Sequence, residues 1–133
     1  MNGHILVIDD ESSWLQMMTL LLESLQCEIT TALSGKEGLN LLRSNPDKYR
    51  AVLLDLMMPE MDGKQVLEEM NDYPELSHIP VILQTGSINK EDIEAALKMG
   101  ARGCLQKPFK RNDLMNVLQS LSSMRGLNLA KVC

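Results

Sequence analysis

Short apolar runs alternate with amphipathic segments along most of the chain. Five runs have the length and aliphatic content of strands, at residues 5–8, 29–32, 51–54, 81–83 and 103–105. The first and third runs are apolar without interruption, which is typical of strands buried on both faces of a sheet. The run at 29–32 is more polar, and we expect it at a sheet edge.

The segments between these runs carry apolar residues at three- and four-residue spacing, which predicts helices. They are expected over residues 13–26, from Ser34 to Asn45–Pro46, from Gly63 to Tyr73–Pro74, over residues 90–99, and from Asn112 or Asp113 to Leu121. Ser12 or Ser13 suits the N-cap of the first helix, and Gly100 suits the end of the fourth. Strands joined by helical crossovers predict an α/β fold with a doubly wound, five-stranded parallel sheet.

Polar residues follow four of the five predicted strands. Asp9 and Asp10 follow the first strand, Asp55 the third, Thr85 the fourth and Lys107 the fifth. In an open parallel sheet, the binding crevice lies beyond the carboxyl ends of the strands, where the winding reverses. If the second strand is the edge, the strand order is 2-1-3-4-5 and these side chains converge on one crevice.

The residue types at this crevice indicate phosphoryl transfer. Three carboxylates close together repel one another and call for a cation, and their hard oxygen ligands favour Mg²⁺. Lys107 offers a positive charge, and Thr85 a hydroxyl donor, to the oxygens of a phosphoryl group. The sequence holds no P-loop, no catalytic Cys/His pair and no nucleophile-elbow serine. Asp55 is the remaining candidate for the nucleophile.

Composition narrows the class of protein. The chain has 133 residues, 44% of them apolar, which suits one domain. Eighteen acidic against thirteen basic residues, a net charge of -5, argue against direct nucleic-acid binding or an anionic membrane surface. No apolar run approaches the roughly 20 residues that span a bilayer, so we expect a soluble, cytoplasmic protein.

The three cysteines, Cys27, Cys104 and Cys133, are an odd number without CxxC spacing. They indicate neither a disulfide framework nor a zinc site.

Four stretches carry a family resemblance: ILVIDDE at 5–11, VLLDLMMPEMDG at 52–63, IPVILQTG at 79–86, and Gly100-Ala101 followed by LQKPF at 105–109. On these motifs the chain resembles the receiver domain of two-component response regulators, of the chemotaxis-regulator type. The resemblance implies the flavodoxin-like (βα)5 fold. We expect a receiver over residues 3–123 and an extension or tail over residues 124–133.

The resemblance implies a role for each motif residue. Asp55 would be the phosphoacceptor, Asp10 would bind Mg²⁺ directly, Asp9 would bind it largely through water, and the backbone carbonyl of Met57 would add a ligand. Thr85 would be the switch hydroxyl.

The same resemblance extends to the strand ends on the far side of the crevice. Lys107 would pair with the phosphoryl group, its peptide bond to Pro108 would be cis, and Gly86 would leave room for the phosphoryl group. Cys104 stands where most receivers carry Tyr or Phe, so the usual rotation of an aromatic ring cannot occur. The output would then rely on Thr85 and backbone movement at residues 87–89, or on another surface.

These observations predict a phospho-accepting signalling switch rather than an enzyme. Asp55 would take its phosphoryl group, in a Mg²⁺-dependent reaction, from a phosphohistidine of a sensor histidine kinase or histidine phosphotransfer protein. The phosphorylated state would alter partner binding and would be hydrolysed slowly by the domain itself. A downstream effector would act in trans or in a missing domain, because the chain is either a stand-alone receiver or part of a hybrid kinase or longer regulator.

Two alternatives remain at this stage. A degenerate receiver could serve only as a docking module, although the acid set, Thr85 and Lys107 are complete. A Mg²⁺-dependent phosphohydrolase with an aspartyl-phosphate intermediate usually carries a second acid two residues after the nucleophile, and that position is Met57.

Overall fold

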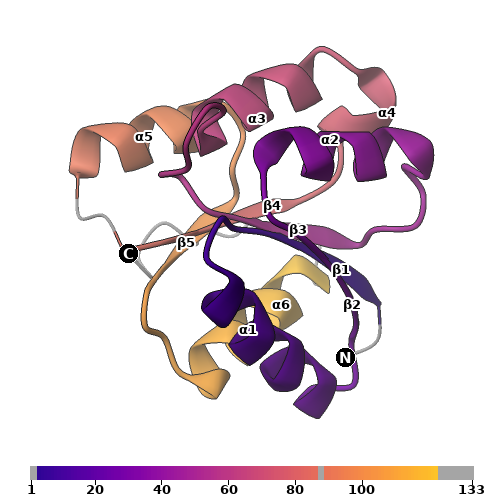
Figure 1. Cartoon of the computed structure of the whole chain (residues 1–133), viewed down its shortest axis with the longest axis vertical. Coiled ribbons are helices and arrows are strands. Elements are labelled where there is room, and N and C mark those ends of the chain that lie inside the picture. Colours follow the sequence, from indigo (N-terminus) through magenta and orange to yellow (C-terminus); the bar gives the residue numbers. More distant parts are fainter. Residues whose placement is uncertain (1–2, 87–88, 123–133) are drawn as a thin grey trace.

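The computed structural model describes residues 3–86 and 89–122, which form one sheet covered by helices. The strands are β1 (His4–Ile8), β2 (Glu28–Ala32), β3 (Ala51–Leu54), β4 (Val81–Thr85) and β5 (Gly103–Gln106). All neighbours pair in parallel, in the order β2-β1-β3-β4-β5 (Figure 1). The predicted strand order is confirmed, and β2 lies at an edge.

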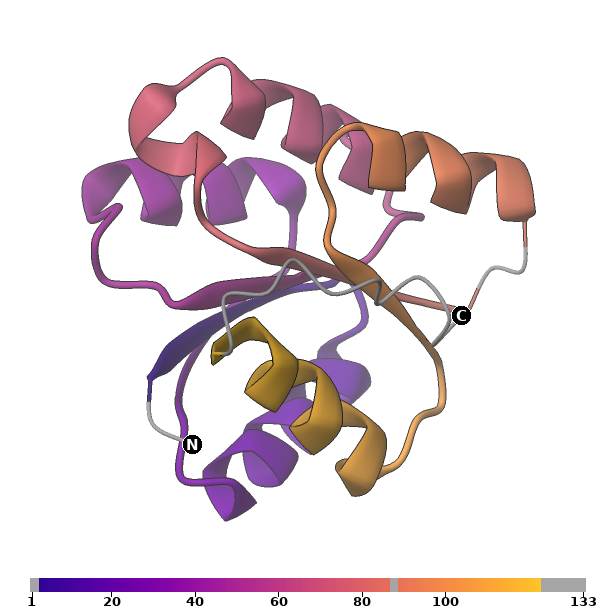
Figure 2. The same ribbon diagram turned by 180° about the vertical axis from the view of Figure 1, so that it is seen from behind.

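The helices lie on both faces of the sheet. They are α1 (Ser12–Ser24), α2 (Gly35–Ser44), α3 (Gly63–Asn71), α4 (Pro74–Ser77), α5 (Lys90–Lys98) and α6 (Arg111–Ser122). α1 and α6 cover one face, and α2 to α5 cover the other, as both views show (Figures 1 and 2). Within the described part of the chain, no helix is long and apolar enough to cross a membrane.

Strand β1, which lies between β2 and β3, contributes side chains to both layers of the core. Ile5 and Val7 pack with residues of α1 and α6, whereas Leu6 and Ile8 pack with residues of α2 and α3. Successive side chains of a strand point to opposite faces, so a strand covered on both sides must be apolar at every position. This requirement explains the uninterrupted apolar run at the start of the sequence.

The predicted cap of the first helix was wrong. α1 begins at Ser12, and its N-cap is Glu11. The side chain of Asp9 accepts a hydrogen bond from the backbone N–H of Glu11 at 2.9 Å, so the chain turns into the helix directly after the acidic run. Glu11 itself bonds Lys107 instead of capping the helix.

α4 was not predicted. Pro74 occupies its first turn, where the missing N–H costs nothing, and Leu76 is buried against the core. A helix of four residues is too short to produce a detectable period in the sequence. The other helix ends differ from the prediction by about one or two residues, as expected for helix boundaries.

Hydrogen bonds and a close backbone contact join the two ends of the loop between β3 and α3. Asp62 caps α3 in a reciprocal arrangement with Gln65, and the N–H of Gly63 donates to the carbonyl of Leu56 at 2.9 Å. A Cβ at Gly63 would lie 2.6 Å from the carbonyl oxygen of Asp55 and 2.9 Å from the Cα of Leu56. Only glycine permits this approach, and the approach fixes the backbone that carries Asp55.

We therefore expect Gly63→Ala to lower the free energy of unfolding by about 1 to 3 kcal/mol, because the rigid backbone must shift to accept the methyl group. Urea denaturation followed by circular dichroism measures this change. Gly86→Ala is the matched control, because its Cβ would meet no atom of the described residues within 4 Å. Equal stability of the two variants would contradict the prediction.

Candidate functional site

The carboxyl ends of β1, β3, β4 and β5 surround one pocket. Its volume is about 320 Å³, and its lining residues are Asp10, Glu11, Asp55, Met57, Thr85, Gly86 and Lys107. Asp9 is 0% exposed and lies beside the pocket, in contact with Lys107. The structure thus brings the side chains that follow the four predicted strands to one place.

Three carboxylates form the acidic part of this pocket. Asp9, Asp10 and Asp55 each offer an oxygen within 4.8 Å of the others, and only Asp10 is exposed. Burial, followed by the charge of Asp9, raises the pKa of Asp55 to about 6. Burial also raises the pKa of Asp9, although its hydrogen bond with Lys107 opposes the shift. Ionising both buried acids is therefore costly unless a positive charge lies close by.

Lys107 supplies part of that charge. Its Nζ lies 2.6 Å from Oδ2 of Asp9, 3.1 Å from Oε1 of Glu11 and 3.8 Å from Oδ2 of Asp55. Burial alone would lower the pKa of Lys107, but the hydrogen bond to Asp9 and the charge of Asp55 outweigh burial and raise it. The Lys107–Pro108 peptide bond is cis. The one ammonium group of Lys107 has three carboxylate neighbours and Asp10 adds a fourth carboxylate to the pocket, so the pocket keeps an excess of negative charge.

This excess fits a divalent cation. The donors are carboxylate oxygens close enough together to share one ion, and Mg²⁺ prefers such hard oxygen ligands. Oδ1 of Asp55 accepts a hydrogen bond from the N–H of Met57 at 3.4 Å, which ties this carboxylate to the loop that follows it. The residues present are therefore suited to Mg²⁺.

Thr85 and Gly86 form the opposite side of the pocket. Thr85 is the last residue of β4 and is 0% exposed, and its carbonyl accepts a hydrogen bond from the N–H of Lys107 at 2.8 Å. Gly86 is exposed, and the space where its Cβ would stand is open among the described residues. A small group entering the pocket would meet both positions.

Cys104 lies on β5, opposite Leu83 of β4, and is 0% exposed. Cys27, directly before β2, is a buried thiol. Residues 87–88, invoked above for the output, lie outside the described residues.

Three residues near the acids were not assigned a role from the sequence. The side chain of Glu11 accepts a hydrogen bond from Lys107. That of Gln84 donates one to Asp9, and that of Trp14 donates one to Gln84. Two of them carried a signal: Glu11 extends the acidic run, and Gln84 is a polar residue within an apolar strand. Trp14 carried none, because it occupies an ordinary position on an amphipathic helix.

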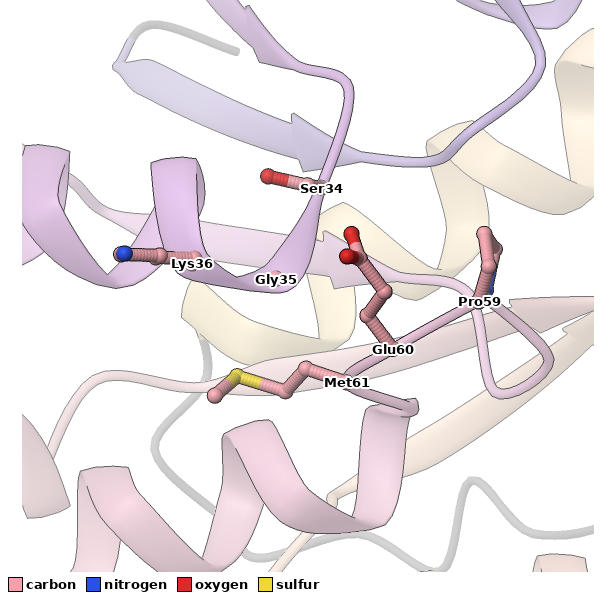
Figure 3. Close-up of a pocket in the computed structure, with 6 residues that line it drawn as sticks. All are labelled: Ser34, Gly35, Lys36, Pro59, Glu60 and Met61. Carbon is pink, nitrogen blue, oxygen red and sulfur yellow. The ribbon is translucent and has the colours of Figure 1, made fainter.

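A second cavity, of about 240 Å³, lies where the β3–α3 loop meets the start of α2 (Figure 3). Its lining residues are Ser34, Gly35, Lys36, Pro59, Glu60 and Met61. Figure 3 shows Glu60 and Met61 reaching from the loop toward the start of α2. The cavity shares no lining residue with the acidic pocket, so the chemistry expected from the sequence belongs to the acidic pocket alone.

The sequence pattern of the response regulator receiver domain matches residues 5–119. The chain belongs to this family. The receiver fold, the acidic cluster at the strand ends and the match over most of the chain agree with one another, and they establish a receiver domain of two-component signal transduction.

Known relatives extend this result. The receiver is 33% identical over 129 residues to the response regulator SaeR of Staphylococcus epidermidis, covering 94% of this chain and 54% of SaeR. It superposes on a receiver domain of Clostridium thermocellum with a TM-score of 0.85 and 34% identity, over 92% of this chain and 96% of that one. The chemotaxis protein CheY4 of Vibrio cholerae gives a TM-score of 0.83 and 26% identity, over 91% and 99% of the two chains.

The chain spans about half or less of the length of the curated relatives compared with it. It covers 54% of SaeR, 49% of a CpxR homologue of Haemophilus influenzae and 7% of a hybrid histidine kinase of Dictyostelium discoideum. The likeness therefore concerns the receiver part of these proteins.

The raised pKa of Asp55 makes a prediction about stability. The unfolded chain ionises Asp55 near pH 4, whereas the folded protein does so near pH 6, so the folded state loses stability as the pH rises between these values. We expect Asp55→Asn, without divalent cations, to be more stable than the wild type by about 1 to 3 kcal/mol at pH 7.5.

This advantage should disappear as the pH falls from 6 to 4, since the wild-type carboxyl group is then protonated in both states. Urea denaturation at several pH values measures it. Asp47→Asn, at an exposed position, is the control and should follow the wild type. Parallel pH profiles for Asp55→Asn and the wild type would show that the prediction is wrong.

Proposed function

We propose that Asp55 accepts a phosphoryl group and that the receiver works as a phosphorylation-controlled switch. The observation that carries this proposal is the position of the Asp55 carboxylate, which lines the pocket together with Lys107, Thr85 and Gly86. Oδ2 of this nucleophile lies 3.8 Å from Nζ of Lys107, and the space where a Cβ of Gly86 would stand is open among the described residues. Positioning and charge neutralisation are the main requirements of phosphoryl transfer.

The donor is a phosphohistidine of a partner protein, or a small acyl or amide phosphate. An oxygen of Asp55 forms a bond to phosphorus while the bond from phosphorus to the donor's nitrogen or oxygen breaks. The donor group leaves with that electron pair. The product is an aspartyl phosphate, which water attacks slowly in line and hydrolyses to restore Asp55.

Asp9, Asp10, Asp55 and the backbone carbonyl of Met57 would hold Mg²⁺, with Asp9 binding largely through water. When bound, Mg²⁺ supplies charge neutralisation for the transferring oxygens. The hydroxyl of Thr85 donates to one phosphoryl oxygen, and the ammonium of Lys107 binds another. Because Lys107 is held by Asp9 and Glu11 in the structure, it must exchange one of these partners for the phosphoryl group.

The partners follow from the same chemistry. A sensor histidine kinase or a histidine phosphotransfer protein supplies the phosphoryl group, and an effector in trans or in a further domain reads the phosphorylated state. We expect both to act in the cytoplasm. The longer relatives, such as SaeR, support a receiver unit over residues 3–123; residues 123–133, with the expected tail, lie outside the described part of the chain.

The proposal is tested by incubating the full chain with Mg²⁺ and acetyl phosphate or phosphoramidate and measuring the intact mass. We expect one phosphoryl group per wild-type chain and none in Asp55→Ala, because Asp55 is, among the described residues, the buried acid that lines the pocket together with Lys107. Asp47→Ala, which removes an exposed acid, is the matched control and should accept the group normally.

Other outcomes separate the alternatives. Rapid, repeated consumption of the donor would indicate a phosphohydrolase. Absence of any adduct with either donor would indicate a docking module. An adduct that persists in Asp55→Ala would place the acceptor elsewhere.

A further inference from the structure

One buried polar side chain beside the acids has no role in the chemistry above. The structure describes four buried polar or charged side chains, those of Asp9, Asp55, Thr85 and Gln84. The first three belong to the acidic site. Gln84 is 0% exposed and lies on β4 next to Thr85, in a strand whose preceding residues are apolar.

Gln84 joins a helix to a carboxylate. The indole N–H of Trp14, on α1, donates to Oε1 of Gln84 at 2.9 Å, and Nε2 of Gln84 donates to Oδ2 of Asp9 at 3.3 Å. An indole can only donate and a carboxylate can only accept, so these two partners determine which way the amide faces. Both ends of the Gln84 side chain are thereby fixed.

Trp14 also contacts the second partner of Asp9. The Nζ of Lys107 lies 4.8 Å from the centroid of the Trp14 ring, within the range of a cation–π interaction. The ring of Phe109 packs edge-on against Trp14 at 5.2 Å, which holds the indole in place. Trp14, Gln84, Asp9 and Lys107 therefore form a closed ring of contacts.

This ring fixes the Asp9 carboxylate. Oδ2 of Asp9 accepts from Gln84 and lies 2.6 Å from Lys107, while Oδ1 accepts from the N–H of Glu11 at 2.9 Å. Groups that orient a metal-binding carboxylate commonly change metal affinity by about 10- to 100-fold when they are removed. Of these partners, Gln84 is a neutral side chain whose position is set from outside the pocket.

We infer that Gln84 is a positioning residue, whose amide connects the Asp9 carboxylate to the Trp14 indole so that Mg²⁺ affinity depends on α1. This inference rests on the proposed Mg²⁺ site. It adds to that site two residues that do not line the pocket. A purely structural role for Gln84 would instead change the stability of the fold and leave the metal affinity of the folded protein unchanged.

The test measures Mg²⁺ binding to the full chain by isothermal titration calorimetry, for the wild type, Gln84→Met and Trp14→Phe. Methionine keeps the length of the side chain and removes both hydrogen bonds of the amide. Phenylalanine keeps one aromatic ring and removes the indole N–H together with the second ring. We expect the dissociation constant for Mg²⁺ to rise about tenfold in Gln84→Met and severalfold in Trp14→Phe. Gln16→Leu, at an exposed position on α1, is the matched control and should bind as the wild type does.

A second measurement needs no metal. The wild-type chain has one tryptophan, so its nuclear magnetic resonance spectrum contains one indole N–H signal. We expect this proton to exchange with water more rapidly in Gln84→Met than in the wild type. Urea denaturation identifies conditions in which each variant is folded, so that affinities are compared between folded proteins.

The outcomes distinguish this inference from the proposed function. Wild-type Mg²⁺ affinity in both folded variants would overturn the positioning role while the Mg²⁺ site stands. A wild-type chain that binds no Mg²⁺ would overturn both. Weaker binding in Gln84→Met and Trp14→Phe, with Gln16→Leu unchanged, would support the inference.

Discussion

The repulsion between the buried carboxylates of Asp9 and Asp55 is the constraint on which this receiver depends. β1 and β3 are parallel neighbours, so the acids that follow them emerge at the same edge of the sheet. Burial removes the water that would separate their charges, and the pKa of Asp55 rises to about 6 as a result. Lys107, arriving from the end of β5, partly compensates this repulsion. The remainder is a free-energy cost that a bound cation removes when Asp55 is ionised, and it couples the stability of the fold to occupancy of the site.

The rest of the fold holds the acids in place despite the repulsion between their carboxylates. The approach of Gly63 to the backbone of Asp55 and Leu56 fixes the loop on one side. The hydrogen bond that the N–H of Lys107 donates to the carbonyl of Thr85 joins the strand ends on the other side. A looser scaffold would let the carboxylates move apart toward water and would lose both their repulsion and their affinity for a cation. Rigidity at the strand ends is thus a functional requirement of the sheet.

The sequence predicted the sheet, its order and the acidic site because each depends on a feature that repeats or stands out along the chain. Uninterrupted apolar runs mark doubly covered strands, and the polar residues that follow four of the five runs mark the functional edge. The four-residue helix α4 and the cap of α1 escaped prediction, because each depends on a few local contacts without a period. Gln84 escaped because its partners, Asp9 and Trp14, lie 75 and 70 positions away in the chain.

The position of Lys107 limits how the site can communicate its state. Lys107 is the cation that lies among Asp9, Glu11 and Asp55. Movement of its ammonium group toward a phosphoryl group is therefore the main displacement of charge among these described side chains. On β5, the buried Cys104 provides no aromatic ring to follow that movement. The ring that does contact the Lys107 ammonium is Trp14, on α1. Any change in the partners of Lys107 must therefore alter the surroundings of a residue on α1, on the face of the sheet opposite α5.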